Sequence, residues 1–116
     1  MEQFRVDQRA ERLYLHLAGE VTFDVAAELR RKVEAMLQEH VFEVLVVDLS
    51  DVPFMDSTGI GTLVALNSKV YGAGKRFALL NVGDRVRKTL ELVKLLDFFI
   101  TAHDEGELDV KLMEAR

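Results

Sequence analysis

The chain has 116 residues, of which 49% are apolar and 30% are charged, so it is large enough to bury one hydrophobic core and is not of disordered composition. Its formal net charge of −5 disfavours nucleic acid as a partner, and the absence of cysteine excludes disulfides, thiolate metal sites and cysteine nucleophiles. No apolar run approaches the ~20 residues that span a bilayer, and the first residues do not resemble a secretory signal. We therefore expect a single domain over residues 1–116, located in the cytoplasm and not inserted in a membrane.

Two short strands are predicted near the start of the chain, over Phe4 to Asp7 and Leu13 to Ala18. In the second segment, leucines at every other position alternate with Tyr14 and His16, which is the period of a half-buried strand. The polar residues 8–12 between the strands predict a hairpin turn. The two strands are therefore expected to form an antiparallel pair.

A helix is predicted to follow, with Asp24 as its N-cap. Its basic segment, Arg30 to Lys32, is expected to face solvent. The apolar stripe that would pack on the sheet consists of Val25, Leu29, Val33, Met36 and Leu37.

The centre of the chain predicts a fully buried strand followed by a second helix. The segment from Glu43 to Leu49 holds four consecutive apolar residues, Val44 to Val47, which favours a strand covered on both faces. Pro53 ends this strand, because proline cannot donate a hydrogen bond to a central ladder. The helix begins near Ser57 and is expected to end between Gly72 and Gly74. Its inward positions are Ile60, Leu63, Val64, Asn67 and Val70.

Two further strands and two further helices are predicted in the C-terminal part of the chain. The strands cover Lys75 to Asn81 and Phe98 to Ala102. One helix is expected after each strand, the first with Asp84 as its N-cap and the second beginning at Asp104-Glu105. Strands that alternate with helices imply right-handed β-α-β units, so we expect an α/β fold with a mixed, mostly parallel sheet of four to five strands and about four helices. The inward side chains are expected to be Val86, Leu90 and Val93 in the first of these helices, and Leu108, Leu112 and Met113 in the second.

A hydroxyl and two glycines stand at the start of the central helix, in the segment Asp56-Ser57-Thr58-Gly59-Ile60-Gly61. A serine here predicts an N-cap, in which its oxygen accepts a backbone N–H. A helix N-terminus also favours an added phosphate, because the helix dipole attracts negative charge. Glycines in a first turn reduce helix propensity by about 0.8–1.0 kcal/mol each relative to alanine, but they let another surface approach the backbone. The cap and the phosphoacceptor are compatible roles for Ser57.

This segment, with the preceding Val-Asp-Leu-Ser of residues 47–50, resembles the core motif of the STAS domain, the fold of bacterial anti-sigma factor antagonists. The resemblance covers nearly the whole chain, including Gly19-Glu20-Val21 and the segment 85–92. It implies that Ser57 is phosphorylated by a partner serine kinase that is itself the anti-sigma factor. The unphosphorylated domain would bind this kinase and free the sigma factor, and a serine phosphatase would reset the domain.

The resemblance also implies a surface that binds the partner. Thr22 stands where many of these antagonists carry an aspartate, and Asp24 is the alternative carrier of that charge. In this scheme the domain is a substrate and not an enzyme, and it needs neither a cofactor nor a metal. The residues implied in partner binding are Thr22, Asp24, Asp56, Ser57, Thr58, Gly59, Ile60 and Gly61.

Two carboxylates, Asp48 and Asp56, are expected at the carboxyl end of the central strand, where open α/β sheets place their sites. Each either holds backbone N–H groups of the loop or charges the surface that a kinase recognises. Acid–base catalysis or a metal site is disfavoured, because no motif ties a histidine, a lysine or a third carboxylate to the pair. The histidines, His16 among them, are interpreted as structural or surface residues, and Thr58 is a rival phosphoacceptor.

Two other functions are open on the sequence alone. The segment from Asp48 to Asp56 is similar to the phosphoacceptor strand and loop of a two-component receiver domain, which is phosphorylated on aspartate. A receiver, however, needs an acidic pair after its first strand and a lysine after its last, where this chain has Val6-Asp7-Gln8 and Ile100 to His103. STAS domains also serve as adaptors in stressosome-like scaffolds and beside lipid-transport machinery.

Overall fold

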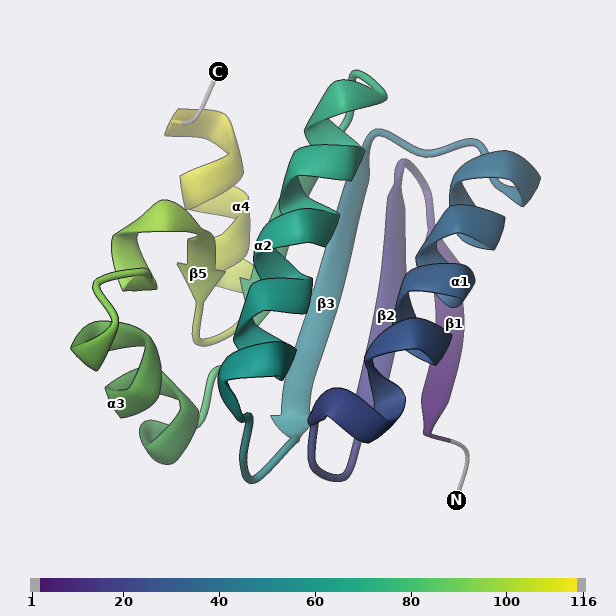
Figure 1. Ribbon diagram of the computed structural model, residues 1–116. Helices are drawn as coiled ribbons and strands as arrows, with labels where there is room; N and C mark the ends of the chain where they lie inside the picture. Colours follow the sequence, from purple (N-terminus) through teal and green to yellow (C-terminus); the bar gives the residue numbers. More distant parts are fainter. Residues whose placement is uncertain (1–2, 115–116) are drawn as a thin grey trace.

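The computed structural model describes residues 3–114, so residues 1–2 and 115–116 of the expected domain lie outside the described residues (Figure 1). Within residues 3–114 the chain forms a five-stranded sheet, four α-helices and one 3-10 helix. The strands are β1 (Phe4–Arg9), β2 (Arg12–Ala18), β3 (Val44–Asp51), β4 (Arg76–Leu80) and β5 (Ile100–Ala102). The helices are α1 (Phe23–Glu39), α2 (Ser57–Gly72), α3 (Asp84–Leu92), η1 (Leu96–Phe98) and α4 (Glu105–Glu114).

The strands lie in the order β1-β2-β3-β4-β5, with β1 antiparallel to β2 and the remaining pairs parallel. This arrangement confirms the predicted α/β fold with a mixed, mostly parallel sheet. It also rules out a receiver domain, whose strand order is 2-1-3-4-5.

Helices cover both faces of the sheet, with α1, α2 and α3 on one side and α4 on the other (Figure 1). Along β3, Leu45 and Val47 belong to the larger hydrophobic cluster, which includes side chains of α1, α2 and α3. Val44 and Val46 point the other way and pack in a second cluster that includes side chains of α4. The expectation that this strand is buried on both faces is therefore confirmed.

The first hairpin is tighter than predicted. Residues 8 and 9 were expected in the turn, but they continue β1 and pair with Leu13 and Arg12. The turn consists of Ala10 and Glu11, and Ala10 adopts a positive φ of 53°. Because β1 is an edge strand with one exposed face, its last polar residues can pair with β2 without being buried. Most other predicted strand ends agree with the structure to within one or two residues.

Two helix caps, the start of the last strand and two inward positions differ from the prediction. Asp24 and Asp84 were expected to act as N-caps, but each lies inside its helix, after Thr22 and Gly83 at the cap positions. Residues 96–98 form a 3-10 helix, so β5 begins at Ile100 rather than at residue 98. Two expected core residues are exposed, because Val93 follows the end of α3 and Met113 falls outside the inward stripe of α4.

The remaining helical stripes agree with the prediction. In α1 the buried residues include Leu29, Val33 and Met36, and in α2 they include Leu63 and Val70. No helix within residues 3–114 has both the length and the apolar character that a membrane crossing requires.

Candidate functional site

Two loops run side by side at the carboxyl ends of β2 and β3. We call them the paired loops, residues 19–22 and 52–56. The backbone N–H of Gly19 donates to the carbonyl of Asp51 at 3.0 Å, and that of Val21 donates to the carbonyl of Phe54 at 3.0 Å. In return, the N–H of Asp56 donates to the carbonyl of Val21 at 3.3 Å. Because one loop leads into α1 and the other into α2, these bonds hold the two helix N-termini next to each other (Figure 1).

Asp56 connects the two helices through a single carboxylate. It is the N-cap of α2, where its Oδ1 accepts the N–H of Gly59 at 2.7 Å. Its Oδ2 accepts the N–H of Phe23, the first residue of α1, at 3.3 Å. A carboxylate at a helix N-terminus satisfies orphan donors and complements the dipole. Of the interpretations that the sequence left open for Asp56, the geometry supports the structural one.

Ser57 is the first helical residue of α2 and is exposed to solvent. Its interpretation as an N-cap was wrong, because the Asp56 carboxylate already performs that role. The hydroxyl of Ser57 therefore lies on the surface at the positive end of a 16-residue helix without a capping function. Thr58 is exposed as well, so the exposure of the two hydroxyls does not distinguish between them as acceptors.

The two glycines of the segment have different reasons to be glycine. Gly59 is buried, and a Cβ built on it would lie 2.1 Å from the carbonyl oxygen of Val21. Gly59 is therefore needed for the paired loops to close. A Cβ on Gly61 would meet nothing within 4 Å, and the residue is exposed. The fold thus explains Gly59 but offers no packing reason for Gly61.

The predicted partner-binding residues differ in their exposure to solvent. Asp24, Ser57, Thr58 and Gly61 are exposed, whereas Thr22 and Asp56 are half-buried. Gly59 and Ile60 are buried, and the Ile60 side chain belongs to the hydrophobic core. The hydrogen bond from Phe23 to Asp56 places the start of α1, and with it Thr22 and Asp24, beside the start of α2.

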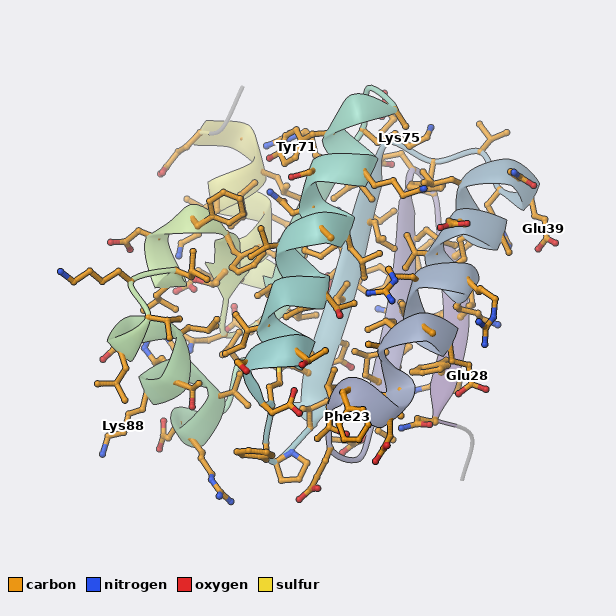
Figure 2. All side chains as sticks on the ribbon, in the orientation of Figure 1. Phe23, Glu28, Glu39, Tyr71, Lys75 and Lys88 are labelled. Atoms are coloured by element: carbon orange, nitrogen blue, oxygen red, sulfur yellow. The ribbon has the colours of Figure 1, made fainter. Side chains whose placement is uncertain are left out.

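Phe23 was not among the predicted site residues. Its side chain is 68% exposed, and Figure 2 shows it at the end of α1 that adjoins the start of α2. One signal was available in the sequence: Phe23 precedes the apolar stripe of α1 and lies between the two residues already implicated, Thr22 and Asp24.

Asp48 lies apart from this surface. Its side chain points to the α4 side of the sheet, where its Oδ2 is 2.6 Å from Nδ1 of His16 and its Oδ1 accepts the N–H of Ser50 and the side-chain amide of Asn81. Burial by itself would raise the pKa of Asp48, but the hydrogen bonds from His16, Ser50 and Asn81 lower the pKa below its ordinary value. Asp48 lies in the C-terminal half of β3, as its position in the predicted strand implied, but its hydrogen-bond partners are different from those of Asp56.

His16, which was interpreted as a structural or surface residue, pairs with Asp48 in the structure, and the sequence did not show this pairing. The two residues are on strands β2 and β3 and occupy paired positions in the sheet. Within residues 3–114 there is no group of three or more His, Cys, Asp or Glu side chains arranged to hold a metal ion.

Comparisons with known proteins cover nearly the whole chain. The sequence model described as the STAS domain matches residues 3–108. The anti-sigma-B factor antagonist of Bacillus subtilis is 30% identical over 102 residues, which are 87% of this chain and 92% of that protein.

Solved structures give the same fold. An anti-sigma factor antagonist from Mycobacterium paratuberculosis superposes with a TM-score of 0.78 at 25% identity, covering 96% of this chain and 91% of that one. The Bacillus cell fate determinant SpoIIAA in its phosphorylated form superposes with a TM-score of 0.67 at 21% identity, covering 91% of this chain and 96% of that one.

Proposed function

The chain belongs to the STAS domain family, and from this membership we propose that it is an anti-sigma factor antagonist regulated by phosphorylation of Ser57. The unphosphorylated protein binds an anti-sigma factor that is also a serine kinase, and this binding frees the sigma factor. The observation that carries the proposal is the exposed Ser57 hydroxyl at the start of α2, beside a carboxylate that already caps the helix. The name and the 30% identity of the Bacillus subtilis relative support the same role.

In the phosphorylation step this chain is the substrate and not the catalyst. The Ser57 oxygen attacks the γ-phosphorus of ATP in the kinase, the bond from that phosphorus to the β–γ bridging oxygen breaks, and ADP leaves. The hydroxyl proton passes to a base of the kinase. What this chain contributes is a hydroxyl on a rigid, exposed helix start that an active site can reach. It requires no cofactor of its own.

Release of the kinase follows from the charge of the product. A phosphoserine carries about −1.5 to −2 charges at neutral pH. Next to the phosphates of ADP in the kinase, that charge meets like charge, and such juxtapositions cost several kcal/mol at an interface. A loss of about 2.8 kcal/mol already weakens binding about 100-fold. Within this chain, by contrast, the phosphate lies at the N-terminus of α2, where the helix dipole stabilises it.

A complete cycle requires a second partner. A serine phosphatase removes the phosphate and restores the binding form. The kinase uses ATP, and the phosphatase uses a phosphoserine on the surface of this protein. We therefore propose that the protein acts in the cytoplasm. We also propose that residues 1–116 form a single domain.

Phosphopeptide mapping tests the proposal. The host serine kinase and Mg-ATP are expected to place phosphate on Ser57, and Ser57→Ala is expected to abolish incorporation. Thr58→Ala is the matched control, because Thr58 is an exposed hydroxyl one residue further along the same helix turn. Incorporation on Thr58, Ser50 or Ser68 would contradict the assignment of the acceptor. A chain that no host kinase labels or binds would instead favour an adaptor function for this STAS domain.

A further inference from the structure

An exposed aromatic side chain adjoins the proposed phosphoacceptor. Phe23 is 68% exposed, compared with 47% for both Tyr71 and Phe98, the other large aromatic residues that stand out on the surface described by residues 3–114. Single exposed apolar residues are common and need no explanation by themselves. Phe23 differs because its backbone N–H is bound by the carboxylate that caps α2, one residue before Ser57.

The surroundings of Phe23 are acidic. Glu20, Asp24 and Asp51 are exposed on or next to the paired loops. The segments 19–24 and 50–58 contain no lysine or arginine. One cation, Arg85 of α3, contacts the paired loops, with its guanidinium 4.9 Å from the centre of the Phe54 ring. An apolar side chain with an acidic surround is complementary to an apolar pocket with a basic border.

The structure assigns Phe23 as the apolar anchor of the partner interface. We propose that the anti-sigma factor kinase receives Phe23 in an apolar pocket bordered by lysine or arginine, which attract Glu20, Asp24 and Asp51. This inference rests on the proposed function, and it adds the chemistry of the partner surface and a contact distinct from Ser57. Binding energy at interfaces is concentrated in a few aromatic anchors surrounded by weaker polar contacts.

The backbone of Phe23 is held in place before any partner arrives. The paired loops are joined by backbone hydrogen bonds, and Asp56 binds the N–H groups of both helix starts. The orientation of α1 relative to Ser57 is therefore fixed by the fold, and binding does not have to order this segment. An anchor on a backbone that is already ordered loses little backbone conformational entropy on binding.

Two tasks are thereby separated on one surface. Phe23 and the acidic side chains supply affinity in either phosphorylation state, whereas Ser57 carries the group that changes. The phosphate on Ser57 is repelled by the nucleotide phosphates in the kinase, whereas Phe23 provides the contact that brings the two proteins together.

Binding to the host kinase that labels Ser57, loaded with ADP, tests the anchor. Phe23→Ala is expected to raise the Kd of the unphosphorylated protein for this kinase about 10-fold or more. The matched control is Tyr71→Ala, which removes an exposed aromatic side chain from the opposite end of α2 (Figure 2). This control is expected to change the Kd by less than about twofold. Circular dichroism and thermal unfolding of both variants establish that each is folded.

Charge reversal tests the basic border. Glu20→Lys is expected to weaken binding and to reduce its dependence on salt, whereas Glu39→Lys, at the far end of α1, changes neither (Figure 2). A folded Phe23→Ala protein that binds within about twofold of wild type overturns the anchor. If Ser57 is still labelled in that case, the proposed function stands. A wild-type protein that neither binds nor is labelled overturns both.

Discussion

The carbonyl oxygen of Val21 occupies the space that a Cβ on Gly59 would need, at 2.1 Å from the position of that atom. The same carbonyl accepts the N–H of Asp56, so it contacts both the loop 52–56 and the first turn of α2. This contact explains why the first turn of α2 contains a residue of low helix propensity. It also separates Gly59 from Gly61, which has open space around it.

Alanine at these two glycines is expected to have opposite effects on stability. Gly59→Ala should reduce the free energy of unfolding by about 1–3 kcal/mol or more, because backbone atoms of Val21 must move. Gly61→Ala, at an open helical position, should be neutral or stabilising by up to about 1 kcal/mol. Urea unfolding measures both. Equal effects would show that the paired loops do not meet as described.

The helix cap is expected to depend on Asp56 and not on Ser57. Asp56→Ala removes the acceptor for Gly59 and Phe23, and should lower the free energy of unfolding by about 1–2 kcal/mol. Ser57→Ala, at an exposed position inside the helix, should change it by less than about 0.5 kcal/mol. Chemical denaturation of the two variants checks this order. A larger loss of unfolding free energy for Ser57→Ala than for Asp56→Ala would show that Ser57 is the N-cap.

Phosphorylation is expected to change affinity far more than stability. Phosphoserine at the start of α2 is favoured by the helix dipole, so the free energy of unfolding should stay within about 1 kcal/mol of the unmodified protein. Affinity for the ADP-loaded kinase should decrease in the order Ser57→Ala, Ser57→Asp, phosphoserine, since the added charge is roughly zero, one and up to two. Calorimetry measures the affinities. A loss of several kcal/mol of stability would instead indicate release through local unfolding.

The Asp48 carboxylate should make stability depend on pH in the acid range. Its pKa in the folded protein lies below the ordinary value of 3.8, so the ionised group stabilises the fold above about pH 4, and this contribution is lost as the pH falls through the folded pKa. The difference in unfolding free energy between wild type and Asp48→Asn should therefore be greatest near neutral pH and shrink on acidification. Urea unfolding at several pH values measures it. A difference that grows on acidification would contradict the assigned direction.

Local patterns were sufficient for most of the fold. The uninterrupted run Val44 to Val47 predicted a strand buried on both faces, and the helical spacing of apolar residues predicted which side of α1 and α2 faces the core. These features depend on residues close together in the sequence, so their period is visible there. The family resemblance of residues 56–61 likewise indicated Ser57 from a short, contiguous motif.

Contacts between distant segments required the tertiary structure. The role of Asp56 depends on Phe23, which is 33 residues away, and the role of Asp48 depends on His16, which is 32 residues away. A helix-capping pattern read locally favoured Ser57 and Asp24, although Asp56, one residue before Ser57, has the same capping chemistry. What no local pattern contained is the second bond of Asp56, which reaches the start of α1 in the other loop. The sequence by itself therefore determined the elements, their burial and the position of the candidate phosphoacceptor. The tertiary structure decided why Gly59 is glycine, why Asp56 also binds the N–H of Phe23 and where Phe23 is exposed, because these depend on the distance between two loops that no local period encodes.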